Sequence, residues 1–146
     1  MTRSTWLPRL RAFALAVLAC AVWGSVWQTQ FNLHELERLG LNIPVATRLS
    51  ATLQDLYRFM PLYAAICLVG LAPAFAVAGW LGRGAARQWL YLPAGGAAVA
   101  AALRSADLLA GIEVLVFATR RAGGLAALVL GGVLAGWLYA RLVRKN

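Results

Sequence analysis

Long apolar segments alternate along the chain with short charged ones. A helix needs about 20 mainly apolar residues to cross a hydrocarbon core of roughly 30 Å, so uncharged runs of this length predict membrane crossings. Two such runs cover residues 12–30 and 59–82, and the second has Pro61 in its first turn, where proline is tolerated. A third uncharged run, residues 123–140, ends at Arg141 and is just long enough to span.

The segment that follows Arg87 is harder to assign, because charged residues interrupt its second half. A helix over about residues 87–110 would place Arg104 and Asp107 near one end and three residues apart, where they can pair or reach the interface. The next stretch, residues 111–122, is too short to cross again, and we predict an interfacial turn there. The pattern therefore predicts four crossings, over about residues 12–30, 59–82, 87–110 and 123–140.

Residues 31–58 form the longest segment outside these crossings and have the pattern of two short amphipathic helices. Asn32 can cap the first helix, with Glu35 at its third position and Gly40 as its stop. The second helix repeats apolar residues at three-to-four-residue intervals, and we expect it to lie along the outer membrane surface. Its apolar positions are Val45, Leu49, Leu53 or Thr52, and Leu56, which leaves Arg48, Gln54, Asp55 and Arg58 largely toward water.

The expected fold is therefore all-α: one membrane domain over residues 1–146, built as a four-helix transmembrane bundle with short amphipathic periplasmic helices. Composition agrees, since 62% of the 146 residues are hydrophobic and only 13% are charged, more apolar surface than a soluble fold of this size can bury. Arg9 and Arg11 before an apolar run also imitate a removable signal peptide, which would leave three crossings. The run continues to Trp27, however, which favours a permanent helix.

The four crossings separate the charged residues into two unequal sets, which predicts the orientation. By the positive-inside rule, the side rich in basic residues is cytoplasmic, so we expect a bacterial inner-membrane protein with both termini in the cytoplasm. The net charge of +9 then reflects topology and not nucleic-acid binding, because the basic residues are divided between loops. One side has eight basic residues and no acid: Arg3, Arg9, Arg11, Arg83, Arg87, Arg141, Arg144 and Lys145. The other has all five acids with six arginines: Glu35, Glu37, Asp55, Asp107 and Glu113 with Arg38, Arg48, Arg58, Arg104, Arg120 and Arg121.

Small residues recur at four-residue spacing within three of the predicted crossings. Such stripes allow helices to approach closely, which favours their association in lipid. We expect the stripes to pack within one bundle, with a dimer interface as the alternative. They are Ala16, Cys20 and Gly24; Gly70, Ala74 and Ala78; and Ala127, Gly131 and Ala135, beside Gly132 and Gly136.

The sequence contains no motif that supports catalysis, a cofactor or a metal site. Cys20 and Cys67 fall at comparable depth in adjacent crossings and can touch, but they lack the CxxC-type pairs of the quinone-linked disulfide oxidases and the electropositive setting of a reactive thiol. His34 is the only histidine and lies outside the crossings, which excludes membrane haem held by paired histidines. We therefore expect a protein that is not an enzyme.

The strongest candidate for a functional site is a set of ionisable residues at the predicted outer face. Three of them lie at and after the end of the third crossing, and three lie in the outer loop. Ionisable groups at membrane depth are often functional, so the set is a candidate for contact with a ligand or partner, and mutual salt bridges are the structural alternative. The residues are Arg48, Asp55, Arg58, Arg104, Asp107 and Glu113.

Stretches in the first half of the chain resemble a known group of proteins. The residues that carry the resemblance are Thr29-Gln30-Phe31, then Arg48-Leu49-Ser50 with Thr52, Asp55 and Leu56, and then Pro61-Leu62-Tyr63. In these residues the chain is similar to small uncharacterised four-helix inner-membrane proteins of proteobacteria, which implies the same topology and no site. The chain lacks the first-helix glutamate of small multidrug exporters and the Arg/Asn-rich motifs of the glutathione-linked membrane enzymes.

Two functions are consistent with these residues. The first is a small accessory or structural subunit that docks to a partner through its helix faces or its outer loop. Besides the lipid bilayer, the expected partner is another membrane protein, and a homo-oligomer is the alternative. The alternative function is a minimal oligomeric transporter or channel for a small or lipid-like molecule, which would need a polar line along several helices. The predicted membrane interior offers little beyond Ser25 and the cysteines, so the accessory role is the leading hypothesis.

Overall fold

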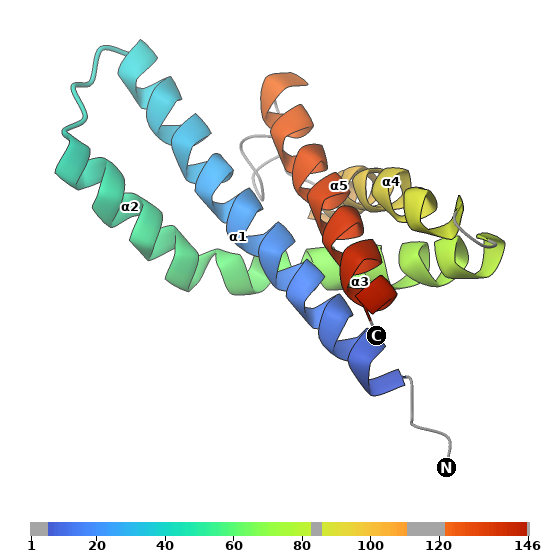
Figure 1. Cartoon of the computed structure of the whole chain (residues 1–146). Helices are drawn as coiled ribbons and strands as arrows, with labels where there is room; N and C mark the ends of the chain where they lie inside the picture. Colours follow the sequence, from blue (N-terminus) through green and yellow to red (C-terminus); the bar gives the residue numbers. More distant parts are fainter. Residues whose placement is uncertain (1–5, 83–85, 111–121, 146) are drawn as a thin grey trace.

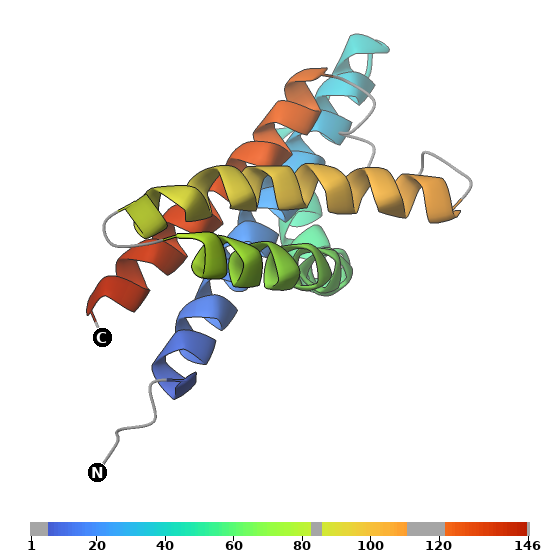
Figure 2. The ribbon, with the colours of Figure 1, turned by 90° about the vertical axis from the view of Figure 1, so that its right-hand side faces the viewer.

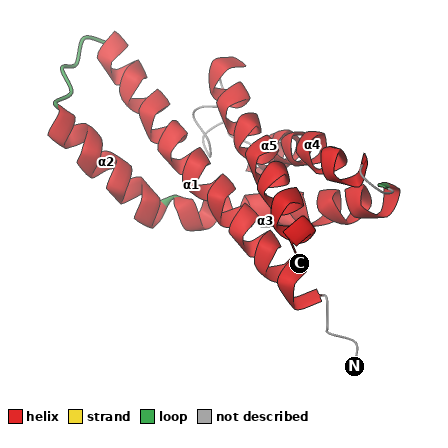
Figure 3. Ribbon diagram, in the orientation of Figure 1, coloured by secondary structure: helices red, strands yellow, loops and turns green. Residues whose placement is uncertain are grey.

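The structure is a computed structural model that describes residues 6–82, 86–110 and 122–145. Within these ranges it has five helices and no strand (Figure 1 and Figure 3). The predicted all-α fold is confirmed, whereas all but the last residue of the predicted interfacial turn lies outside the described residues. The helices are α1 (Trp6–Arg38), α2 (Val45–Arg58), α3 (Met60–Leu81), α4 (Ala86–Ala110) and α5 (Ala122–Lys145).

α1 is one continuous helix of 33 residues, which corresponds to about 50 Å. The prediction that a separate short helix begins at Asn32 is wrong, because no glycine or proline interrupts this stretch and Leu33 remains buried. The predicted stop at Gly40 is confirmed. Gly40 has a φ of 90°, the left-handed conformation common just after a helix, and its N–H donates to the Glu37 carbonyl at 2.9 Å.

The four long helices, α1, α3, α4 and α5, form a bundle in which packed neighbours run antiparallel. In the α1–α5 pair, Trp23 Nε1 donates to the Ala127 carbonyl at 2.8 Å toward one end, and Phe13 contacts Tyr139 toward the other. The α3–α4 pair crosses the α1–α5 pair obliquely (Figure 2). The start of α1, the end of α3, the start of α4 and the end of α5 therefore share one end of the bundle. We call it the termini end, and the opposite end the loop end.

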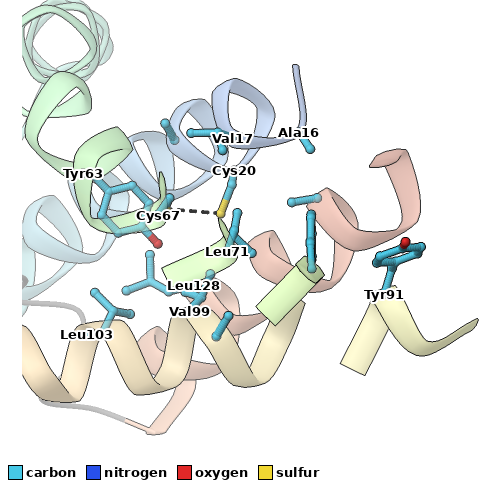
Figure 4. Packing of buried hydrophobic residues seen from close by; sticks show 14 of the residues in the cluster. Ala16, Val17, Cys20, Tyr63, Cys67, Leu71, Tyr91, Val99, Leu103 and Leu128 are labelled. Atoms are coloured by element: carbon cyan, nitrogen blue, oxygen red, sulfur yellow. Dashed lines mark hydrogen bonds between the residues drawn. The ribbon is translucent and has the colours of Figure 1, made fainter. Parts of the chain in front are cut away.

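Small and apolar side chains fill the interior between the four long helices (Figure 4). Tyr63, Leu71 and Leu128 are fully buried there. α4 and α5 meet backbone to backbone, and a Cβ added at Gly132 would lie only 2.8 Å from the Gly95 carbonyl carbon. The expected packing of small residues within one bundle is confirmed for the α1 and α5 stripes, which are buried at Ala16, Cys20, Gly24, Ala127, Gly131, Gly132, Ala135 and Gly136.

The stripe of small residues on α3, which consists of Gly70, Ala74 and Ala78, also lines a groove on the bundle surface. The groove runs between α3 and α4 and has a volume of about 1030 Å³. Gly70 and Ala74 of α3 face Ala97 and Ala101 of α4 across it, so its walls are almost entirely apolar. In a membrane, such a face is covered by lipid or by another helix.

Three helices are long and apolar enough to cross a membrane: α1, α3 and residues 122–144 of α5. Their outward faces carry exposed apolar side chains such as Leu18, Leu68 and Leu130, as expected of helices surrounded by lipid. These features indicate a membrane protein. α4 has sufficient length, at 25 residues, but Arg104 and Asp107 fall within it and much of the remainder is alanine and glycine, which are less apolar than leucine.

Candidate functional site

The predicted outer-face set is divided between two helices in the structure. Arg48 and Asp55 lie on α2 and turn toward α1, where Arg48 forms an ion pair with Glu37 and its Nη1 donates to Gln30 Oε1 at 3.2 Å. Thr29 Oγ1 lies 2.7 Å from Asp55 Oδ2. These two residues are therefore occupied by α1, and the prediction that they point largely toward water is wrong.

Of the other four residues of the set, the structure describes three. Arg58 is exposed at the end of α2, as predicted. On α4, Arg104 is exposed and Asp107 is half-buried. Glu113 lies outside the described residues. Pairing within the protein, the structural alternative to a ligand or partner contact, thus accounts for Arg48 and Asp55. The partners described above come from α1, whereas the sequence pointed to the end of the third predicted crossing.

The engagement of the polar side of α2 leaves its apolar side exposed. Val45, Leu49, Leu53 and Tyr57 follow one another at four-residue spacing and are 80%, 62%, 59% and 83% exposed. Amphipathic helices in soluble proteins have the reverse arrangement, with the apolar stripe buried. We call these four residues the α2 stripe; within the described part of the chain, no residue of α2 is buried.

The two thiols, Cys20 of α1 and Cys67 of α3, are buried where these helices pack against each other. Cys67 Sγ lies 3.5 Å from Cys20 Sγ, and Tyr63 is buried beside them (Figure 4). The prediction that the cysteines can touch is confirmed. Both thiols belong to the buried hydrophobic cluster, together with the Tyr63 ring, and such a setting favours the protonated, unreactive form of a thiol. Among the described residues, no three His, Cys, Asp or Glu side chains are grouped so as to hold a metal ion.

A second site, at the termini end, was not predicted from the sequence. Phe13, Phe75, Tyr91 and Tyr139 come from α1, α3, α4 and α5, and their rings form one cluster. The Phe75–Tyr139 centroids are 4.8 Å apart, those of Tyr91 and Tyr139 4.9 Å, and those of Phe13 and Phe75 6.0 Å. Each long helix thus contributes one ring to a contact that joins all four.

The aromatic cluster forms the floor of a pocket of about 600 Å³ whose wall includes two arginines. Arg87 Nε donates to Tyr91 Oη at 3.3 Å, and Arg9 lies one turn before Phe13 on α1. In the sequence, both arginines stand out only as topological charges. The available signal was the four-residue spacing of each arginine from an aromatic residue, but only the fold brings the two pairs together.

No protein-family model, curated protein or solved structure matches the chain, so no relative assigns a role to either site. The resemblance to four-helix inner-membrane proteins stays a prediction.

Proposed function

We propose that the chain is a bacterial inner-membrane protein whose four long helices all cross the bilayer, with both termini in the cytoplasm. The antiparallel order supports this proposal, because it returns the chain to the termini end after every second helix. α4 completes the bundle: its Tyr91, Val99 and Leu103 are buried, and its length of 25 residues corresponds to about 37 Å. Arg104 and Asp107 lie in its last two turns, from which long side chains can reach the interface.

Within this topology, we propose that the protein is a non-enzymatic accessory subunit that docks to a partner membrane protein through the α2 stripe. The observation that carries this proposal is the exposure of the stripe while the opposite face of α2 is held by α1. The last residues of α1 carry an ion pair between Arg38 and Glu35, and Arg48 of α2 pairs with Glu37 beside them, so the first half of the stripe lies beyond the hydrocarbon core. Contiguous apolar surface in water marks a binding site for another protein.

The accessory role also fits the filled interior of the bundle. Ser25, Gln28 and Thr29 are buried near the loop end of α1, but toward the termini end the interior consists of apolar residues, the two thiols and the aromatic cluster. A polar path through one copy of the chain is therefore absent from the described residues. The alternative, an oligomeric transporter for a lipid-like molecule, would have to use the apolar groove between α3 and α4.

The topology is tested with reporter fusions that are active only in the periplasm. A reporter placed after Asn146 should be inactive, and one placed at Asn42, between α1 and α2, should be active. A fusion within residues 111–121, between α4 and α5, should also be active, because four crossings place this segment outside. Activity after Asn146 would overturn the orientation, and an inactive fusion between α4 and α5 would exclude α4 as a crossing.

Docking is tested by replacing single residues of α2 with a photoreactive amino acid in native membranes. We expect a covalent adduct with one other protein from position 49, in the stripe, and none from position 54, where Gln54 is exposed off the stripe. Leu49→Asp should then release that protein during copurification, whereas Gln54→Asp should not. Adducts that contain only two copies of this chain, or only lipid, would refute the accessory role.

A further inference from the structure

The pocket at the termini end combines two positive charges with an apolar floor. It is lined by residues of all four long helices, including Arg9 and Trp6 of α1, Trp80 of α3 and Arg87 of α4. A Cβ added at Gly79 of α3 would lie 3.3 Å from Arg87 Nη2, so this glycine gives the guanidinium room to lie across α3. Arg87 is thereby held over the pocket and not free in solvent.

The two arginines have no counter-charge of their own in this pocket. Among the described residues, none of the side chains that line it is acidic. The ion pairs of the described chain involve Arg38 and Arg48, both at the loop end. Both Arg9 and Arg87 line the same pocket as the Tyr139 ring. Two positive charges that converge beside a low-dielectric interior favour an anion between them.

Surrounding residues place the pocket at the depth of lipid headgroups. Arg9 is in the first turn of α1, and Arg87 is the second residue of α4. Trp6, Trp80 and Trp89 are exposed at the same helix ends, by 64%, 81% and 72%. Tryptophan is enriched where hydrocarbon meets headgroups, so these three residues mark that boundary.

We propose that this pocket binds the phosphate group of an anionic phospholipid. Arg9 and Arg87 hold the phosphate oxygens through charge-assisted hydrogen bonds, which arginine forms in a bidentate manner. The Tyr91 and Tyr139 hydroxyls are available as further donors, and the first acyl carbons lie against Phe75 and the exposed tryptophans. Basic pockets between membrane helices are known to take anionic headgroups. The inference requires only that the helices are embedded in a membrane and does not depend on the accessory role.

A soluble phosphate compound shares the chemistry that the arginines recognise, but the apolar part of the pocket favours the lipid. Trp6, Leu10 and Trp80 border it with exposed apolar surface that a small soluble anion would leave in contact with water. A phospholipid covers this surface with its acyl chains while its phosphate reaches the guanidinium groups. Affinity should therefore depend on both the charge and the chains.

The test is native mass spectrometry of the full chain in mild detergent with added lipid. We expect the wild-type protein to retain phosphatidylglycerol about tenfold more strongly than phosphatidylcholine with the same chains, because the choline cation offsets the phosphate charge and is repelled by the two arginines. Arg9→Gln and Arg87→Gln should each reduce retention of phosphatidylglycerol about tenfold. The matched control is Arg11→Gln, which removes one charge two residues from Arg9 but lies outside the pocket and should change retention less than about twofold.

Three outcomes would overturn the proposal. Equal retention of the two lipids by the wild-type protein would do so without reference to any variant. An effect of Arg11→Gln as large as that of Arg9→Gln would show that only the overall positive charge matters. Displacement of phosphatidylglycerol by equimolar glycerol phosphate would assign the site to a soluble anion. Circular dichroism of each variant identifies loss of helix, and Arg87→Lys, which keeps the charge, should retain more lipid than Arg87→Gln.

Discussion

The crossing of α4 and α5 should tolerate less added volume than any exposed part of the helices. A Cβ added at Gly136 would lie 2.6 Å from the Tyr91 carbonyl carbon and 3.0 Å from Leu92 Cα. Both are backbone atoms, so no side-chain rotation relieves the clash. Carbon atoms pack at about 3.5–4.0 Å, and α4 would therefore have to move by about 1 Å to accept an alanine at position 136.

Two opposing effects determine how much Gly136→Ala changes the free energy of unfolding. Forced overpacking costs about 1–3 kcal/mol, and the Gly95–Gly132 contact one turn away along α5 would be disturbed by the same movement, which favours the upper part of this range. Alanine is better than glycine in a helix by about 1 kcal/mol, which offsets part of the cost. Gly136→Ala should therefore lower the free energy of unfolding by about 2 kcal/mol.

The measurement is reversible unfolding by sodium dodecyl sulfate in mixed micelles, followed by circular dichroism. The matched control is Gly123→Ala, also on α5, where an added Cβ would have no atom of another residue within 4 Å. That variant should be neutral or stabilised by up to about 1 kcal/mol from helix propensity alone. If Gly136→Ala is as stable as Gly123→Ala, the close approach of α4 and α5 in this structure is incorrect.

Two further predictions concern the contacts of α1. Mild oxidation should link Cys20 to Cys67 within one chain and protect both thiols from maleimide after denaturation. Continued labelling of both thiols would contradict the packing of α1 on α3. In the control variant Cys20→Ser, Cys67 should stay open to labelling. Glu37→Gln removes the ion pair with Arg48, whose side chain is 31% exposed against 34% for Glu37, so water screens the pair. The loss in unfolding free energy should be below about 1 kcal/mol, and a loss above about 2 kcal/mol would show that the loop-end contacts are more strongly coupled than their exposure indicates.

Helix positions could be predicted from the sequence because they depend on local composition. α1, α3 and α5 match the three uncharged runs to within a few residues, α4 matches the segment that follows Arg87, and Gly40 ends α1 as a glycine with positive φ should. The error at Asn32 has the same local origin. Asn32 was interpreted as an N-cap, but a cap residue acts as one only where the preceding helix has ended, and nothing before Asn32 ends it.

The orientation of α2 could not be predicted, because its amphipathic pattern has two consistent solutions. Its polar face can turn toward water, as expected from the sequence, or toward polar groups of another helix. α1 supplies such groups in Gln30 and Glu37, and the contacts of Arg48 with them select the second solution. The pattern fixes which residues share a face, and only the tertiary contacts decide where that face points.

The charge asymmetry that predicts the orientation also explains why an anion site should form at the termini end. Among the described residues, no acidic side chain lies at that end, so the arginines there have no acidic side chain to pair with. Arg141 lies over the Trp137 ring at 4.9 Å, and a cation–π contact of this kind satisfies a charge without an acid. Arg9 and Arg87 line one pocket, and an anion bound there would interact favourably with both charges. At the loop end, where acids are present, Arg38 and Arg48 pair internally. A counter-charge for this pocket would therefore come from outside the described chain, and at the depth of the headgroups anionic lipid is its most concentrated source.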